Sequence, residues 1–375
     1  MSYDCESRKA MHHAPMRSVR VLHAIHSLRG GGAEAQLRLL CTAWSDPAVE
    51  MAVLCVQPDD VVLPERVRVI GLNNRQPLSV AYLTEIVRTI RAVDPDVVHV
   101  WLPASVSIPV MVSARLLGKA VVFSYRSKMT FHRPLCVPEF AAALACAQRI
   151  VSNSPMEGSN AAFRWLFRLK NGAVIPNGTA SVPGGRNEAD SRSDRKWRFI
   201  FVGRLTRLKN CDVLLHAFDM LAGRSDWHLD LFGVGEEEGR LRKFVERRNL
   251  QDRVVFRGYE RNIQARMRES DCLVLPSLSE GMPNVLIEAM AVGLPVVASD
   301  VPGIRWVVGN ESAVVWVDPS RPGHIAEHLA AIMDGRVDTK LMVGAGYRIA
   351  GRYSPGVMVD RYRDFYRSLA SGTVD

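Results

Sequence analysis

Two glutamates lie close together in the segment SEGMPNVLIEAMAVGLPVVASD, residues 279–300. Glu280 precedes a Gly-Met-Pro turn, and Glu288 interrupts the otherwise apolar run VLIEAMAV. Pro283 and Asn284 are typical of a helix start, and Gly293 is typical of a helix end. We therefore expect a helix of about ten residues, roughly 15 Å long, with Glu288 inside it.

The two carboxylates suit sugar hydroxyls better than phosphates. Side chains in a helix lean toward its N-terminus, so the carboxylate of Glu288 should reach back toward the first turn. The free N–H groups of that turn favour a phosphate, which a carboxylate would repel. Ribose hydroxyls are better partners for Glu288, and Glu280 could accept hydrogen bonds from a sugar. The alternative is that Glu288 pairs with a buried arginine or lysine, because an unpaired buried charge is costly.

Cations that could hold a diphosphate occur in FVGRLTRLKN, residues 201–210. A strand is expected to end at Val202, Gly203 permits a tight turn, and a helix should begin near Asn210. Arg204 and Lys209 flank the loop between them, where two cations are well placed to bind phosphate groups. A solvated basic loop before a capped helix is the alternative interpretation.

Two glycine-rich loops are less specific. LFGVGEEEGRL, residues 231–241, lacks the third glycine of the dinucleotide fingerprint, so it indicates either a close approach to a ligand or a plain tight turn. GGGAEAQL, residues 30–37, opens a helix and could cradle a phosphate or admit a sugar, or it could bind nothing. It is not a P-loop, because no Lys-Ser/Thr pair follows the glycines.

Several classes of function are disfavoured. No metal-ligand spacing and no hydrolase signature occur, and no apolar run is long enough to cross a membrane. The seven cysteines are scattered without a C-x-x-C pair, which favours free thiols in a reducing cytoplasm. The formal charge of +9 fits an anionic substrate or an anionic membrane. A nucleic acid partner is not expected, because no RNA- or DNA-binding signature is present.

The elements that must position these residues repeat one pattern. Short apolar strand candidates alternate with helical segments in both halves of the 375 residues, which predicts two doubly wound α/β domains. Ligands bind such sheets at the carboxyl ends of the strands, so we expect the site in a cleft between the domains. The expected divisions are a flexible extension (1–17), a first domain (18–180), a linker (181–197), a second domain (198–352) and a C-terminal helix crossing back (353–375).

Five segments together resemble the retaining glycosyltransferases of family 4. They are VGRLTRLKN, VIPNG (174–178), GYERN (258–262), GGAE (31–34) and residues 276–303, and the resemblance runs from about residue 18 to residue 370. It implies the GT-B fold, two Rossmann-like domains facing across a cleft, with the donor held mainly by the second and the acceptor by the first. It also implies transfer with retention and without a metal or other cofactor.

The resemblance implies substrates as well as a fold. The donor would be a nucleotide-diphosphate sugar, with a UDP-sugar favoured and GDP-mannose as an alternative. The acceptor would be a glycan or lipid-linked glycan in the synthesis of a cell-surface polysaccharide such as lipopolysaccharide or capsule. Two other readings remain: another GT-B enzyme, such as a nucleotide-sugar 2-epimerase or a phosphorylase, and a non-catalytic protein that binds nucleotides or glycans.

Carried over position by position, the resemblance gives roles to individual residues. Arg204 and Lys209 would bind the donor diphosphate and stabilise the leaving group, Glu280 would bind the transferred sugar, and Glu288 the ribose. Further donor contacts are expected at glycines and at the start of the glutamate helix: Gly31, Gly32, Gly203, Gly281, Met282, Pro283, Asn284 and Val285.

One departure from the family and two basic segments concern the acceptor. Arg126 stands where many relatives carry a histidine, and it could contact the donor sugar or an anionic acceptor. Residues 124–133 and 160–171 combine cations with aromatic and apolar side chains, which suggests contact with an anionic bilayer at the inner face of the cytoplasmic membrane. The alternative for residues 160–171 is a helix that packs its aromatic side chains into the core.

Overall fold

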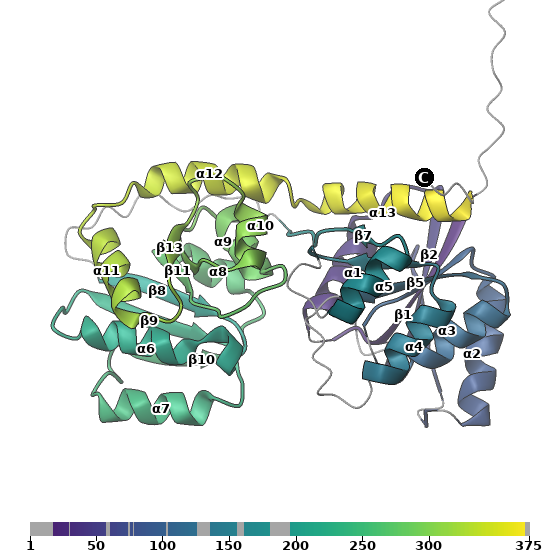
Figure 1. The fold of residues 1–375 in the computed structure, drawn as a ribbon, viewed down its shortest axis with the longest axis horizontal. Coiled ribbons are helices and arrows are strands. Elements are labelled where there is room, and N and C mark those ends of the chain that lie inside the picture. Colours follow the sequence, from purple (N-terminus) through teal and green to yellow (C-terminus); the bar gives the residue numbers. More distant parts are fainter. Residues whose placement is uncertain are drawn as a thin grey trace, which may run out of the picture.

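The chain forms two parallel β-sheets, each covered by helices on both faces (Figure 1). The computed structural model describes residues 18–29, 31–57, 61–73, 76–77, 79–102, 104–125, 136–155, 161–180 and 196–371. The predicted pair of doubly wound α/β domains is confirmed. Arg126 and Gly30 lie outside the described residues, as do most of residues 124–133.

The first sheet has seven strands in the order β3-β2-β1-β4-β5-β6-β7. Its strands are short apolar runs, as expected for parallel strands buried on both faces. They are β1 (Val19–Ser27), β2 (Val49–Gln57), β3 (Arg68–Gly71), β4 (Val97–Val100), β5 (Ala120–Tyr125), β6 (Arg149–Ser152) and β7 (Ala173–Val174).

Helices cover both faces of the first sheet. One face packs a core that includes Tyr82, Ile86, Met111 and Leu166, and the other packs Leu37, Leu40 and the C-terminal helix. The helices between its strands are α1 (Gly32–Ala43), α2 (Val80–Val93), α3 (Ser107–Leu116), α4 (Cys136–Cys146) and α5 (Ala161–Leu169).

The second sheet has six strands in the order β10-β9-β8-β11-β12-β13. They are β8 (Trp197–Val202), β9 (Trp227–Phe232), β10 (Val254–Gly258), β11 (Cys272–Leu275), β12 (Val296–Ser299) and β13 (Val315–Val317). Its helices are α6 (Cys211–Met220), α7 (Glu238–Arg247), α8 (Ile263–Arg268), α9 (Asn284–Ala291), α10 (Pro302–Val308), α11 (Pro322–Met333) and α12 (Thr339–Gly351), and a short 3-10 helix covers Arg207–Lys209.

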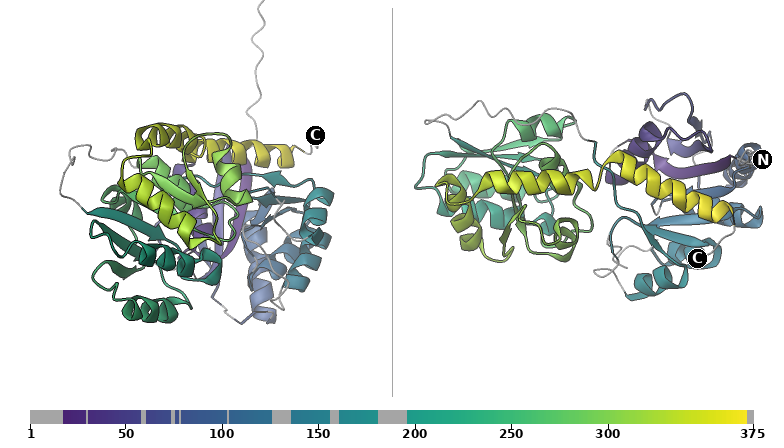
Figure 2. Two further views of the ribbon diagram at one scale, coloured as in Figure 1. Left: turned by 60° about the vertical axis from the view of Figure 1, so that its left-hand side comes forward. Right: turned by 90° about the horizontal axis from the view of Figure 1, so that it is seen from above.

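The last helix, α13 (Pro355–Ala370), covers the first sheet although it follows the second in the sequence. It contacts α1, β1 and β4, so the chain crosses between the sheets twice (Figure 2). The two crossings are joined by a hydrogen bond of 2.8 Å from the Thr179 N–H to the Tyr353 carbonyl. This hydrogen bond holds the two connecting segments together between the sheets.

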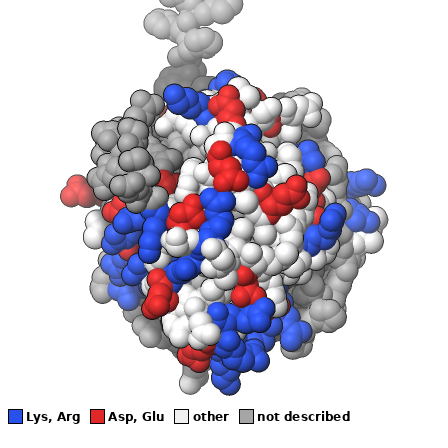
Figure 3. All heavy atoms as spheres, turned by 90° about the vertical axis from the view of Figure 1, so that its left-hand side faces the viewer, with Lys and Arg blue, Asp and Glu red and all other residues white. Residues whose placement is uncertain are grey.

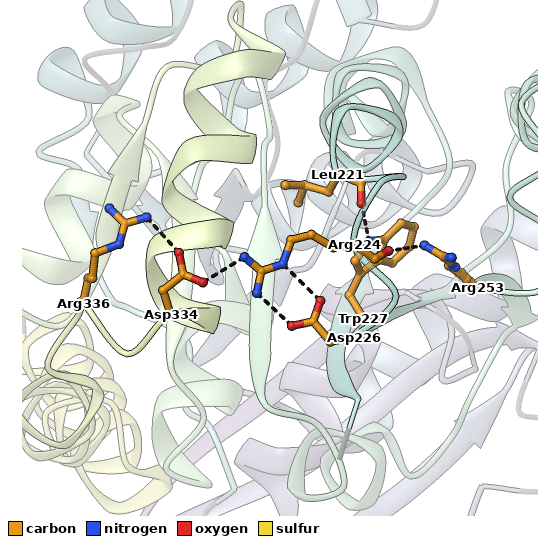
Figure 4. Close-up of polar contacts among 7 residues, drawn as sticks. All are labelled: Leu221, Arg224, Asp226, Trp227, Arg253, Asp334 and Arg336. Carbon is orange, nitrogen blue, oxygen red and sulfur yellow. Dashed lines mark hydrogen bonds and ion pairs between the residues drawn. The ribbon is translucent and has the colours of Figure 1, made fainter. Parts of the chain in front are cut away.

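A polar cluster ties elements together at the amino end of β9 (Figure 4). The guanidinium of Arg224 donates to Asp226, at 2.8 and 3.0 Å, and to Asp334 at 2.8 Å. These bonds hold the pKa of both carboxyls below their usual range. On the neighbouring end face of this domain, basic and acidic side chains are interspersed (Figure 3).

Candidate functional site

The predicted site segments follow the strands at which the strand order reverses. In the first sheet β1 lies between β2 and β4, and in the second β8 lies between β9 and β11. The loop with Gly31 follows β1, the loop with Arg204 and Lys209 follows β8, and the segment with Glu280 follows β11. This is where doubly wound sheets bind ligands, because helix N-termini and loop amides converge there.

Lys209 and Glu280 form an ion pair. The Lys209 Nζ lies 2.6 Å from the Glu280 Oε1, with the side chains 21% and 8% exposed. The sequence predicts separate roles for these residues, as a diphosphate ligand and a sugar ligand, and does not predict their contact. An ammonium group has three donors, so one can serve Glu280 while the others remain for a ligand.

Arg204 is exposed on the loop after Gly203. Within the described ranges its side chain makes no hydrogen bond or ion pair, so its guanidinium is available to an anion. Gly203 keeps this loop close to Lys209: a Cβ there would lie 3.3 Å from the Phe201 ring and 3.6 Å from the Lys209 stem. A Cβ at this position would therefore press on the Phe201 ring and would be in ordinary contact with the lysine stem.

Glu288 lies in α9, as the sequence predicts, and it differs electrostatically from Glu280. Burial raises the pKa of its carboxyl above the usual range. Among the residues that the structure describes, no side chain forms a hydrogen bond or ion pair with it. The alternative prediction, that Glu288 pairs with a buried arginine or lysine, is therefore not supported by the described residues. A carboxylate in this position is suited to hydroxyl donors from a ligand.

The glycines after β9 allow two backbone segments of the protein to pack closely against each other. A Cβ at Gly233, where φ is 132°, would overlap the carbonyl oxygen of Gly203, and a Cβ at Gly235 would overlap the backbone of Leu205. The Leu205 N–H also donates to the Val234 carbonyl at 3.0 Å. Gly233 and Gly235 therefore bring one loop against the loop that carries Arg204 and Lys209.

Residues of the first domain meet the start of α9. The Asn177 Nδ2 donates to the Asn284 Oδ1 at 2.8 Å, and the Asn177 N–H donates to the Met282 Sδ at 3.1 Å. A Cβ at Gly32 would lie 3.8 Å from the Asn284 Nδ2. The side chains of Met282 and Pro283 are buried and that of Val285 is half-buried. Because these side chains are largely buried, a ligand at this turn would contact the backbone of residues 281–285.

Gly31 faces a carboxylate. It immediately precedes α1, and a Cβ there would lie 2.7 Å from the Glu34 Oε2. Because a phosphate at this helix start would be repelled by Glu34, the loop is better suited to sugar hydroxyls. The contacts of Glu34 and Asn177 were not predicted from the sequence, although Asn177 belongs to the VIPNG segment. Among the described residues, no group of three or more histidine, cysteine or acidic side chains could hold a metal ion.

Comparisons with known proteins agree on one family. The model of the glycosyltransferase family 4 matches residues 30–180, and that of the glycosyl transferases group 1 matches residues 186–347. The lipopolysaccharide core biosynthesis glycosyltransferase LpsE of Rhizobium meliloti is 24% identical over 92% of this chain and 98% of its own. An uncharacterized glycosyltransferase of Haemophilus influenzae is 38% identical, but the match spans 39% of this chain and only 40% of that protein.

Solved structures share the fold across both domains. Anabaena Alr3699/HepE, solved in complex with UDP and glucose, has a TM-score of 0.75 and 19% identity over 93% of this chain and 100% of its own. The sucrose-phosphate synthase of Thermosynechococcus elongatus has a TM-score of 0.74 and 20% identity over 95% and 100%. These neighbours confirm the predicted GT-B fold. Together the two family models match well over half of the chain, from residue 30 to residue 347 with a short gap. The chain therefore belongs to the glycosyltransferases of family 4, and its second domain matches the group 1 glycosyl transferases.

Proposed function

We propose that the protein is a retaining, metal-independent glycosyltransferase that uses a nucleotide-diphosphate sugar. The observation that carries the proposal is the Lys209–Glu280 ion pair beside the exposed Arg204, at the ends of β8 and β11. This arrangement offers positive charge for a diphosphate and a carboxylate for a sugar. A UDP-sugar is the favoured donor, supported by the UDP and UDP-glucose complexes of HepE, and GDP-mannose is the alternative.

The proposed reaction takes place on one face of the donor sugar. The acceptor hydroxyl oxygen forms a bond to the anomeric carbon, while the bond from that carbon to the β-phosphate oxygen breaks. The hydroxyl proton passes to the departing phosphate oxygen. Arg204 and Lys209 stabilise the charge that develops on the diphosphate, Glu280 orients the sugar, and Glu288 accepts from the ribose hydroxyls. Arg126 remains a candidate contact to the donor sugar or to an anionic acceptor.

The acceptor we propose is a glycan or lipid-linked glycan of a cell-surface polysaccharide. A relative supports this class by name: LpsE of Rhizobium meliloti is a lipopolysaccharide core biosynthesis glycosyltransferase. A lipid-linked acceptor would bring the enzyme to the inner face of the cytoplasmic membrane.

Helix α5 supports a peripheral contact with an anionic membrane. Trp165 and Leu169 are 52% and 55% exposed and lie one turn apart, while Phe163 and Leu166 are buried. The expectation of aromatic packing into the core therefore holds for Phe163 but not for Trp165. The exposed arginines Arg164 and Arg168 flank these apolar side chains, as in helices that bind anionic lipid surfaces. Among the described residues, no helix combines the length and the apolar character needed to cross a bilayer.

Hydrolysis of a panel of UDP-, GDP- and ADP-sugars tests the function and identifies the donor. Arg204→Ala and Lys209→Ala should each lower the turnover number by about 10²–10³, because each removes a group that stabilises the leaving diphosphate. Circular dichroism should show that both variants remain folded. Near-normal activity in both would contradict the site, and NMR of the transferred sugar's anomeric configuration would test retention.

Liposome flotation tests the membrane contact. The wild-type protein should float with vesicles that contain anionic lipid at low salt and not with neutral vesicles. Trp165→Ser should weaken flotation, whereas Leu341→Ser, at a leucine 57% exposed on α12, should not. If the two variants float equally well, α5 is not the membrane contact.

A further inference from the structure

Asn210 follows Lys209 and occupies the N-cap position of α6 in a left-handed conformation, with φ 58° and ψ 34°. An asparagine at this position usually accepts a hydrogen bond from the first turn of its helix. Asn210 makes no such bond, and the residue is only 8% exposed. The buried amide therefore serves something other than the helix that it begins.

The amide of Asn210 joins three loops. Its Nδ2 donates to the Pro276 carbonyl at 3.0 Å and to the Pro319 carbonyl at 2.7 Å. Pro276 directly follows β11 and leads into the segment with Glu280, and Pro319 lies in the loop after β13. Both N–H groups of the amide are used. One side chain thus fixes the carboxyl ends of β8, β11 and β13 relative to one another.

The two residues before Asn210 also contact the loop that follows β11. The Leu278 N–H donates to the Leu208 carbonyl at 2.9 Å, and the Lys209 ammonium lies 2.6 Å from the Glu280 carboxylate. Three successive residues, 208 to 210, therefore contact residues 276 to 280. The side chain of Lys209 is long and flexible, so its position depends on how firmly this loop is held.

We propose that Asn210 is a positioning residue that places Lys209 for the leaving diphosphate by fixing its loop to the loop of Glu280. The inference rests on the function proposed above for Lys209. A displacement of about 1 Å at a reacting group can lower a rate about 10²-fold, so a loosened loop should affect turnover. A purely structural asparagine would affect stability alone.

Asn210→Gly separates the two roles. Glycine adopts the left-handed conformation without strain, so this variant keeps the backbone and removes only the amide. Asn210→Asp also tolerates this conformation, and it replaces the donor nitrogen, with both of its N–H groups, by an oxygen atom that faces two carbonyls. The matched control is Arg224→Gln, which disrupts the polar cluster at the amino end of β9, away from the site.

The measurements are UDP-glucose hydrolysis, UDP titration calorimetry and amide hydrogen exchange at 25 °C. Asn210→Gly should lower the turnover number about 10- to 100-fold and speed exchange in residues 203–210 and 276–282. In a Lys209→Ala background the same change should lower turnover by less than about twofold, because Asn210 acts through Lys209. Arg224→Gln should leave turnover unchanged. If Asn210→Gly does not fold, Asn210→Asp is the second variant. It should lower the turnover number and speed exchange by similar factors.

The outcomes distinguish this inference from the proposed function. A wild-type protein that neither binds UDP nor hydrolyses UDP-glucose would overturn both for this donor. An active wild type with faster exchange but unchanged turnover in Asn210→Gly would overturn the positioning role alone. An undiminished effect of Asn210→Gly in the Lys209→Ala background would do the same, because it would show that Asn210 does not act through the lysine.

Discussion

Two carboxylates eight positions apart have opposite electrostatic environments. Glu280 is held by the ammonium of Lys209, whereas burial raises the pKa of Glu288 without a partner among the described residues. An uncompensated buried carboxyl lowers the stability of the free protein. Such a group is useful where a ligand supplies the missing hydrogen bonds, as the hydroxyls of a ribose would.

Glu288→Gln should therefore raise stability and weaken donor binding. The amide has nearly the same shape and carries no charge, so the melting temperature near pH 8 should rise by a few degrees. The affinity for UDP should fall by about tenfold, because a hydrogen bond to a charged acceptor contributes about 1.5–3 kcal/mol. Thermal denaturation and UDP titration measure the two effects.

The control for Glu288→Gln is Glu327→Gln, at an exposed glutamate of α11. It should change neither quantity. A loss of stability in Glu288→Gln, with UDP affinity unchanged, would mean that the carboxylate holds the fold rather than the donor.

Glu139, in the first turn of α4, is 3% exposed and so more deeply buried than the half-buried Glu288. Burial raises its pKa from 4.5 to about 7. The unfolded chain therefore releases this proton at lower pH than the folded chain, so Glu139 lowers stability as pH rises through this range. Glu139→Gln should melt at nearly the wild-type temperature at pH 4.5 and above it at pH 8.

The pH dependence identifies the cause. Glu65→Gln, at an exposed glutamate of the same domain, should show no difference from wild type at either pH. A Glu139→Gln variant whose melting temperature exceeds that of wild type equally at both pH values would contradict ionisation as the cause.

Single residues at the site were predictable, but their pairing was not. The motifs place Arg204 and Lys209 between β8 and α6, Glu280 before a helix and Glu288 inside that helix, and the structure agrees. The Lys209–Glu280 contact joins positions 71 apart, and the Asn177–Asn284 bond joins positions 107 apart. Such contacts depend on which strands are neighbours, and strand order does not follow from local sequence.

At the scale of elements, the site depends on two loops packed backbone against backbone. Gly233 and Gly235 allow the loop after β9 to lie against residues 203–205. From the sequence alone, these glycines could either approach a ligand or form a plain tight turn. The structure shows instead that they approach another loop of the protein, which long-range packing alone determines.

Gly233→Ala should damage the fold and the site together. The new Cβ would overlap the Gly203 carbonyl, and a φ of 132° is strained for any residue with a side chain. We expect a loss of about 1–3 kcal/mol in stability and a fall in UDP affinity, measured by urea denaturation and calorimetry. Gly239→Ala, in helix α7 where a Cβ meets nothing within 4 Å and alanine favours the helix, should lower neither stability nor UDP affinity. Equal behaviour of the two variants would contradict the packing argument.

Elements with strong local signals were predicted, including the C-terminal helix, but those between residues 300 and 353 were not assigned. Strand β13 has only three residues, fewer than a recognisable apolar alternation needs. Helix α12 contains Gly344 and Gly346, which weaken a helical pattern. Gly346 is explained by close packing, because a Cβ there would lie 3.3 Å from the Met290 side chain of α9. The reason for this glycine lies 56 positions away in the chain.

At the scale of the whole molecule, the last helix of the second half of the chain packs into the first domain. His99 of β4 lies 2.7 Å from the Tyr366 hydroxyl of α13 and 2.7 Å from the Ser124 hydroxyl of β5, and all three residues are buried. Arg367 adds an ion pair of 2.8 Å to Asp46. Because α13 covers one face of the first sheet, that domain is completed only when the last helix docks.

Tyr366→Phe should weaken the docking of α13 without altering the donor site. The change leaves one nitrogen of the buried His99 without its tyrosine partner, which costs about 1–3 kcal/mol. Each kcal/mol lowers a melting temperature by about 2–4 °C in a domain of this size, so the thermal transition of the first domain should fall by several degrees. UDP affinity at 25 °C should stay unchanged, because the second domain supplies the proposed diphosphate contacts.

Amide hydrogen exchange shows where the molecule loosens. In Tyr366→Phe it should become faster in residues 355–370 and in β4. The control Tyr259→Phe, at a tyrosine 72% exposed, should change neither the exchange rates nor the melting temperature. Faster exchange confined to the second domain would show that α13 stabilises the molecule by some route other than this buried hydrogen bond.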